Sequence, residues 1–547
     1  MKQQQKLTTR VWHRVCDTCE SASVHLQRQL GDALLVIDPR RAQKPPRVLS
    51  FFLALLVLLV VSAGMLWLGD KFNAQGVALT RFMARAQAPL TASYYPGSGR
   101  DRIAVFLYDR QFLSANQLAW PLSYQQHADG LLRLAQDPAA RPKALFLDVT
   151  FGQQRLDPTL PALREALCTL QNVYRVPVFL AALASPETGQ LTVRDGLARE
   201  GAPCFTLVGV DYLPDTLDGT AWTYQLTRHL AGDSWQAGPA PMSTPGAPAY
   251  RSAALAMAQD AGGVTTGPEK APMALVWGKN SAAMPAGHAP DSLAGCRQGQ
   301  FELSSLVPGF LRPGTEGPLA PLCPYHATLS MDQVNQLSDT EIAPYLKDRF
   351  VLVGAQVPGQ NDFATSPVQG LVPGIHMHAM ALDNLLVYGP DYKLSEEWSW
   401  RGSSALWLPA LFAVMAVFAV QALGARLADV WRRATPPGGG PRWVAALKRR
   451  LETGRARLTG HPRRYRAKTI NTAARLLGWL LSLSFKTIAA MLMIVVLQRF
   501  WRIGMLPVVE LVSMTLVAEA LGLLDKLRDA LVVSDGEPPA EKSGHRD

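Results

Sequence analysis

The sequence predicts an α/β domain, with a mostly parallel sheet and flanking helices, joined to four transmembrane α-helices. Between residues 101 and 388, short apolar segments rich in strand-forming residues alternate with amphipathic segments of helical periodicity. This alternation favours parallel strands that are covered by helices. Four longer apolar segments, one before this region and three after it, each have the length of about 20 residues that crosses a bilayer as a helix.

The first predicted span, residues 48–69, contains no charged side chain. A polar, basic segment of 47 residues precedes it. The apolar region of a cleavable signal peptide normally falls within the first ~30 residues, so we expect this span to be retained. The other predicted spans are residues 403–425, 476–497 and 504–524.

Lysine and arginine indicate which segments face the cytoplasm. Residues 1–47 contain nine of them and residues 426–475 contain fourteen, so the positive-inside rule places both segments, and the tail 525–547, in the cytoplasm. Residues 70–402 then lie in the periplasm of a bacterial inner membrane. The net charge of +11 therefore follows from topology; we expect membrane lipid as a partner of the basic segments, and no nucleic acid.

Cysteine usage agrees with this topology. Cys168, Cys204, Cys296 and Cys323 all fall in the predicted external region, where disulfides are permitted. We favour the pairs Cys168–Cys204 and Cys296–Cys323, although the other pairings of these four residues stay open.

Five elements begin the external domain. Residues 103–108 are a short apolar segment typical of a buried strand, and residues 124–136 follow with helical spacing. A second strand is predicted over 144–151, a helix over 160–173 and a third strand over 176–182. The order of strand and helix is that of parallel pairing.

The second half of the domain is less regular. Residues 231–295 are rich in Gly, Pro, Ala and Ser, and we expect a long insertion with weak local structure. A helix is predicted over 331–346 and a glycine-ended strand over 350–354. The segment 372–379 leads into a last helix that ends at Leu386.

With these elements in order, residues 101–388 resemble a CHASE2 domain, the extracellular sensor domain of transmembrane receptors. The resemblance rests on the order of several motifs, which are Tyr108-Asp109, Trp120-Pro121, His127-Ala128, Phe146-Leu-Asp148-Val-Thr-Phe151, Asp157, Val351-Leu-Val-Gly354-Ala355, Pro373-Gly-Ile-His376-Met-His378-Ala379 and Asp383-Asn384-Leu385-Leu386. CHASE2 proteins typically have one span before the sensor and three after it, and related receptors work as oligomers. The resemblance thus implies a homo- or hetero-oligomeric sensor.

Two features depart from this family. CHASE2 receptors usually continue into a cytoplasmic output domain, whereas 23 residues follow the fourth predicted span. We therefore expect the output to come from a separate effector, which would bind residues 1–47 or 426–475. The insertion at 231–295 is the second departure, and the resemblance supplies no ligand residues to transfer.

The candidate ligand pocket consists of four residues, Asp109, Asp148, His376 and His378. Asp109 lies at the carboxyl end of the first predicted strand and Asp148 near the end of the second, and ligands of open parallel sheets bind at the carboxyl ends of the strands. The histidines could reach the same rim, where carboxylates and imidazoles could bind a metal or perform acid/base chemistry. The alternative is that the aspartates cap helices and the histidines pack in a helix-start turn.

Lys486 and Glu519 are predicted to form an ion pair inside the membrane. Ionisable residues within spans usually face the bundle interior and pair, and these two lie at more similar depths than Lys486 and Glu510. The pair could clamp two helices together, contact another subunit or relay a signal.

Two cytoplasmic segments could dock partners. Trp443, Leu447 and Leu451 recur every four residues with basic residues between them, which suits a helix on an anionic leaflet or a docking site for an effector. Near the N-terminus, the residues His13, Cys16, Cys19 and His25 include a CxxC pair, but their spacing favours free thiols over zinc.

The sequence therefore predicts a sensory, ligand-binding membrane protein that signals to a separate partner. We expect no catalytic residue, no metal and no cofactor. One alternative is a structural or assembly subunit of an envelope complex that uses the fold as a scaffold. Another is a periplasmic hydrolase that uses Asp109, Asp148 and the histidines.

Overall fold

The computed structural model describes residues 91–395, with gaps, together with residues 81, 84–85, 88–89 and 504. The gaps are 186–187, 199–203, 213, 232–233, 238–248, 266–271, 284–289, 291–294, 298–321, 358 and 360–361. All described residues belong to one compact unit, Arg81–Ser404 with Val495–Leu506.

The membrane spans predicted above lie outside the described residues, apart from Gly504. Among the residues that the structure describes, none of the helices has both the length and the apolar character of a membrane span.

Seven strands form the main sheet, and its core is parallel. The order across the sheet is β11–β1–β12–β2–β3, with β5 parallel to β3 and a short β4 antiparallel to the end of β3. The strands are β1 (Ile103–Asp109), β2 (Ala144–Leu147), β3 (Val178–Ala184), β4 (Leu191–Thr192), β5 (Thr206–Gly209), β11 (Ala327–Ser330) and β12 (Phe350–Gln356).

The strand β1 lies between β11 and β12 and is covered on both faces of the sheet. All seven of its residues are buried, as is typical of strands that lie between two layers of helices. In the sheet, Ala104 pairs with Ala327 on one side and with Val351 on the other. Alternate β1 side chains enter two different cores, one on each face.

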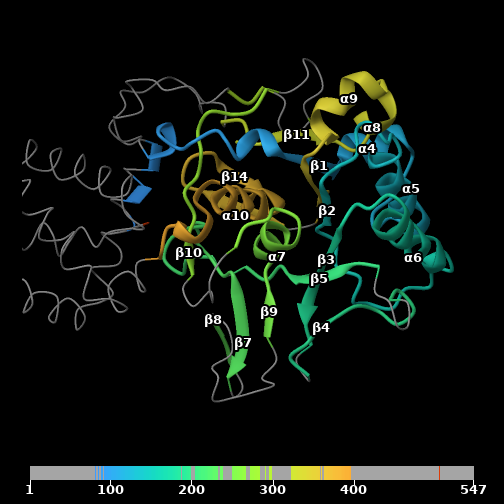
Figure 1. Ribbon diagram of the computed structural model, residues 1–547, viewed down its shortest axis with the longest axis horizontal. Coiled ribbons are helices and arrows are strands. Elements are labelled where there is room, and N and C mark those ends of the chain that lie inside the picture. Colours follow the sequence, from blue (N-terminus) through green and yellow to red (C-terminus); the bar gives the residue numbers. More distant parts are fainter. Residues whose placement is uncertain are drawn as a thin grey trace, which may run out of the picture. The chain divides into compact units, whose positions relative to one another are not determined.

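Helices cover both faces of the sheet (Figure 1). One face is covered by α7 (Ala253–Asp260) and α10 (Ile375–Tyr388), which pack against each other. The other face is covered by α4 (Arg110–Ala115), α5 (Tyr124–Leu134), α6 (Leu160–Cys168), α8 (Gln333–Gln336) and α9 (Asp339–Leu346). The result is a three-layer α/β/α domain, which agrees with the α/β part of the predicted fold class.

The predicted helix over 331–346 is two helices, α8 and α9. Leu337 is extended and Ser338 begins α9 with a capping box that includes Glu341. The capping box satisfies backbone N–H groups at a new helix start, so the chain turns between the two helices. The helix predicted over 160–173 also changes form, because α6 ends at Cys168 and a π-helical turn, Thr169–Val173, follows it.

The expectation of weak local structure over 231–295 is wrong for its described core. The helix α7 is buried almost throughout. Four of its eight residues are alanines, which pack closely without producing an apolar segment of the usual strength. Beside it, β7 (Thr227–Ala231) pairs with β8 (Ser234–Ala237) and β9 (Ala249–Arg251) in an antiparallel sheet.

Small elements complete the described domain. The strand β6 (Thr223–Tyr224) pairs with β10 (Met273–Ala274), and β13 (Phe363–Ser366) forms a hairpin with β14 (Gly370–Pro373). Short 3₁₀ turns at Arg100–Arg102 and Gly389–Asp391 precede β1 and follow α10.

Two disulfides join the chain in the pairing that the sequence favoured. The bond Cys168–Cys204 ties the end of α6 to the segment before β5. The bond Cys296–Cys323 joins two positions between β10 and β11, and Cys323 lies just before β11.

Candidate functional site

A cavity of about 1010 Å³ lies at the carboxyl edge of the sheet. The residues that line it include Asp148 directly after β2, Ser185 directly after β3, Val210 directly after β5 and Ala355 near the end of β12. The carboxyl edge of a parallel sheet is where ligands of such folds bind. The fold therefore places polar groups from several strands around one space.

Asp148 is the deepest carboxylate of this cavity. Its backbone N–H donates to the carbonyl of Val353 at 2.8 Å, which holds it at the sheet edge. The side chain is 10 % exposed, and its Oδ2 lies 3.9 Å from Nε2 of His378. That distance is too long for a direct hydrogen bond. Among the described residues, no side chain or backbone group donates a hydrogen bond to the Asp148 carboxylate.

Asp362 is a second carboxylate, exposed at the rim of the cavity. Its backbone carbonyl accepts a hydrogen bond from the N–H of Gly374 at 2.9 Å. Its side chain lies against Gly374, where a β-carbon would collide with the carboxylate. Glycine at this position therefore allows the loop before β13 to approach the start of α10.

The two carboxyl groups oppose each other's ionisation. Burial raises the pKa of Asp148 well above its usual value, and the charge of Asp362 raises it further. Partial desolvation also raises the pKa of Asp362. Two carboxylates that share one site titrate as a pair, because the first charge disfavours the second.

His378 projects from α10 toward the carboxyl group of Asp148. Its Nδ1 lies 2.7 Å from the hydroxyl of Tyr224, and burial lowers the pKa of His378 to about 4. The ring is therefore neutral near pH 7. With its proton on Nε2, His378 accepts a hydrogen bond from Tyr224 and directs an N–H group at Asp148.

Aromatic side chains form another wall of the cavity. The ring of His127 lies edge-on to Trp120 and Phe151, at centroid distances of 6.2 and 5.4 Å. Burial, with a smaller effect of the charge of Arg155, lowers the pKa of His127 to about 4. Its buried Nδ1 has no hydrogen-bond partner within the described part of the chain. The Trp120–Pro121 peptide next to it is cis.

Arg155 is the one lysine or arginine among the described residues that line the cavity. Its Nη2 donates to the carbonyls of Leu122 at 2.8 Å and Pro121 at 3.2 Å. The guanidinium also lies over the ring of Tyr124, at 5.2 Å from its centroid. These contacts hold the cation against the wall of the cavity.

The predicted pocket residues divide into two groups. The structure brings Asp148 and His378 together, whereas Asp109 and His376 do not line the cavity. Asp109 caps α4, because its Oδ1 accepts from the N–H of Phe112 at 2.9 Å, and it also accepts from the hydroxyl of Ser330 at 2.7 Å. Burial, with a smaller effect of a neighbouring histidine, lowers the pKa of His376 to about 3.

The described residues contain no group of three or more His, Cys, Asp and Glu side chains that could hold a metal ion. The other predicted site residues lie outside the described residues. They are Lys486, Glu510, Glu519, Trp443, Leu447, Leu451, His13, Cys16, Cys19 and His25.

Comparison with known families identifies the family to which the domain belongs. The family model of the CHASE2 domain matches residues 52–420, which is more than half of the 547-residue chain. The chain belongs to the CHASE2 family. No curated protein and no solved structure matches the chain. The resemblance predicted over 101–388 is thus confirmed, and the match continues beyond both ends of that region.

Several CHASE2 motif residues now have a structural place. Trp120, His127, Asp148 and His378 line the cavity. Asp157 accepts a hydrogen bond from the N–H of Tyr124 at 2.9 Å, so it helps to begin α5 at the cavity wall.

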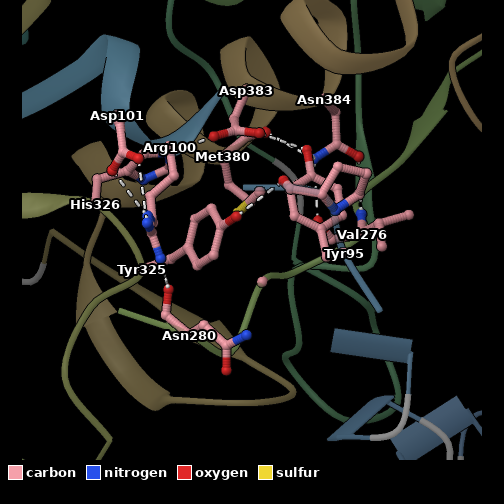
Figure 2. Close-up of polar contacts among 12 residues, drawn as sticks. Tyr95, Arg100, Asp101, Val276, Asn280, Tyr325, His326, Met380, Asp383 and Asn384 are labelled. Atoms are coloured by element: carbon pink, nitrogen blue, oxygen red, sulfur yellow. Dashed lines mark hydrogen bonds and ion pairs between the residues drawn. The ribbon is translucent and has the colours of Figure 1, made fainter. Parts of the chain in front are cut away.

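A second polar cluster of the CHASE2 domain surrounds Asp383, near the carboxyl end of α10 (Figure 2). The Asp383 carboxylate is fully buried. It accepts a hydrogen bond from the hydroxyl of Tyr95 at 2.6 Å and contacts Nε2 of His326 at 3.0 Å. Gly99 packs so closely on this carboxylate that no β-carbon would fit. Burial raises the pKa of Tyr95, and the charge of Asp383 raises it further.

Asn384 extends this cluster to a neighbouring segment (Figure 2). Its amide nitrogen donates to the carbonyl of Val276 at 3.0 Å and to the hydroxyl of Tyr95 at 3.2 Å, and its amide oxygen accepts from the N–H of Val276 at 3.1 Å. One end of α10 is therefore fixed to the segment that leads into the domain, and the other end lines the cavity.

Sequence reasoning missed Asp362, Arg155 and Tyr212. Tyr212 also lines the cavity, and its buried hydroxyl has no partner within the described residues. Burial raises the pKa of Tyr212 to about 12. Asp362 follows the strand predicted over 350–354, so a search for polar side chains after that fourth predicted strand would have found it.

Proposed function

We propose that this CHASE2 domain is a ligand-binding sensory module, in which a small molecule in the cavity changes the position of α10. The observation that carries the proposal is that α10 contacts both the cavity and the segment that leads into the domain. His378 lines the cavity and Asp383 binds Tyr95. At a rise of 1.5 Å per residue these two positions are about 8 Å apart along the helix.

Contacts at the ends of the domain support this route. Tyr95 follows a helical turn at residues 91–93, after the first predicted span. After α10, Leu394 forms a bridge with Met273, and its carbonyl accepts a hydrogen bond from the N–H of Gly504 at 3.2 Å. Gly504 begins the fourth predicted span. Segments near several predicted spans thus meet the domain close to where α10 ends.

We place the domain in the bacterial periplasm, with the four predicted spans in the inner membrane and both termini in the cytoplasm. The two disulfides support this placement, because disulfides persist in oxidising compartments. The output would pass to a separate effector bound to the basic segments 1–47 or 426–475. The family of the domain is sensory, but fold similarity alone does not assign a ligand or a partner.

The test is affinity purification of the tagged full-length chain in mild detergent, with quantitative mass spectrometry of the proteins that copurify. Wild type is compared with Asp148→Asn in the cavity, with Asp391→Asn as the control and with a chain that lacks residues 426–475. Asp391 is exposed in the turn after α10. A sensor predicts a cytoplasmic effector that is lost with the deletion and changes in amount with Asp148→Asn but not with Asp391→Asn.

Partners that copurify in equal amounts with wild type and Asp148→Asn would reject sensing and support a scaffold in an envelope complex. A hydrolase is the second candidate, because the Asp148–Asp362 pair beside neutral His378 could exchange protons with a substrate. Turnover of a periplasmic substrate that Asp362→Asn abolishes without loss of the fold would establish that candidate.

A further inference from the structure

We propose that the cavity recognises an organic cation, whose primary ammonium group pairs with the carboxylates of Asp148 and Asp362. This inference rests on the proposed function and names the chemical class of the ligand. It starts from the charge of the cavity wall. Two carboxyl groups and one arginine line the cavity, and Arg155 is already bound to two backbone carbonyls and a tyrosine ring.

The second step is the unsatisfied carboxylate of Asp148. Its side chain is nine-tenths buried and lines the cavity, and within the described residues it receives no hydrogen bond. A buried carboxylate without a donor costs free energy. An ammonium group offers three N–H donors and a positive charge, so it can satisfy the oxygens of both carboxylates.

The third step is the position of Asp362. Asp148 is buried, but Asp362 is exposed at the rim, so a cation can reach the pair from solvent. Phe363, the next residue, lines the same cavity and is 39 % exposed. Its ring can cover the methylene groups of an alkylamine, and aromatic faces attract cations. The buried hydroxyl of Tyr212 offers a further polar contact.

Other ligand classes fit this wall less well. A divalent metal ion takes six or more oxygen ligands from protein and water, and the described residues contain no cluster of three ligating side chains. An anion would meet two carboxylates, and His127 and His378 are neutral near pH 7, because burial lowers the pKa of each to about 4.

Proton release distinguishes this site from a merely structural carboxyl pair. Below the raised pKa values of Asp148 and Asp362, the pair holds a proton that an ammonium ligand must displace. Affinity should therefore rise with pH. The other titratable groups that line the cavity are His127 and Tyr124 from α5, Arg155 after β2, Tyr212 after β5 and His378 from α10. Burial lowers the pKa of His127 and His378 to about 4 and raises that of Tyr212 to about 12, so these three side chains stay neutral between pH 5 and 8.

The experiment is calorimetric titration of the full-length protein in detergent with three amines, n-butylamine, 1,4-diaminobutane and spermidine. Controls are n-butanol, glutamate and Mg²⁺. We expect at least one amine to bind, with release of protons at pH 6 as measured in two buffers of different ionisation heat. Loss of one charge-assisted partner weakens binding by about tenfold or more, so Asp148→Asn and Asp362→Asn should each show this loss. Asp391→Asn should bind as wild type.

A thermal melt without ligand shows whether each variant is folded, and Asp148→Asn should not melt below wild type. The inference is overturned if no amine binds, or if amine affinity is equal in wild type and Asp148→Asn. Binding of glutamate or n-butanol alone, with effector recovery that still depends on Asp148, would reject the cation but keep the sensor. Amine binding without any change in the recovered effector would keep the cation site and reject the sensor.

Discussion

The carboxyl group of Asp148 is buried at the end of β2, next to a second carboxyl group. In the unfolded chain such a group ionises near pH 4. In the folded chain its pKa is raised, first by burial and then by Asp362. Folding at intermediate pH therefore takes up a proton or buries a charge, and both reduce stability relative to a neutral side chain of the same size.

Asp148→Asn should stabilise the protein at neutral pH. Below the unfolded pKa, the carboxyl group of Asp148 is protonated in both the folded and the unfolded chain, and its ionisation costs no stability. Stability is lost as the pH rises through the raised folded pKa. The gain from asparagine should thus be on the order of 1 kcal/mol at pH 7.5 and smaller at pH 4.5. Thermal melts of wild type and variant at both pH values measure it. A variant that melts lower than wild type at pH 7.5 would contradict the assigned burial.

The side-chain direction decides which predicted site residues share the cavity. Strand ends could be predicted from sequence, and both Asp109 and Asp148 do follow apolar strands. However, Asp109 turns back to cap the helix that begins at the next residue, whereas no helix begins directly after Asp148. His376 and His378 are two residues apart on the helix α10, so their side chains face different neighbours. Sequence alone gives the positions and not these orientations.

The helix α10 contacts the rest of the domain at both of its ends. Its first turns line the cavity, and Asp383 and Asn384 near its carboxyl end form hydrogen bonds to three other segments. A rigid helix with both kinds of contact moves as a unit when one end is displaced. The Asp383 cluster is therefore the place where a change at the cavity would reach Tyr95.

Tyr95→Phe should destabilise the domain, because it removes the hydroxyl that donates to the buried Asp383 carboxylate. Loss of such a charge-assisted bond costs about 2 kcal/mol. The adjacent Tyr94 is 58 % exposed, so Tyr94→Phe is a matched control with an expected change of about zero. Chemical denaturation of the two variants provides the comparison. Equal stability of the two would show that the Asp383 cluster is not a structural link.

The elements that could be predicted are those whose segments differ clearly from their surroundings in apolar character. The strands β1, β2, β3 and β12 are continuous apolar segments and were found. The strands β5 and β11 were missed, because polar residues interrupt their short apolar pattern, at Thr206 in β5 and at Thr328 and Ser330 in β11. The helix α7 was missed because alanine gives little apolar contrast. Propensity alone does not reveal a helix whose burial depends on close packing with α10.

The two disulfides should stabilise the whole domain. Cys168 and Cys204 are 36 residues apart, and a cross-link over such a loop contributes about 3–4 kcal/mol. The double variant Cys168→Ala/Cys204→Ala should therefore lose most of this stability, and reductant should reduce the difference from wild type. Alkylation of the unreduced full-length protein, read by mass spectrometry, should modify Cys16 and Cys19 but not the four paired residues. Modification of Cys168 or Cys296 would reject the pairing.

The position of β1 in the sheet also sets the order in which the domain can fold. This strand is near the start of the domain, yet both of its neighbours, β11 and β12, lie near the end. A ribosome therefore releases β1 long before either partner strand exists. Until residues 327–356 have been synthesised, β1 has two unpaired edges and an apolar surface on each face. Pairing of such distant segments makes folding slow and leaves early chains prone to aggregation. Nascent chains of this protein should thus depend on chaperones that bind apolar strands until synthesis has passed β12.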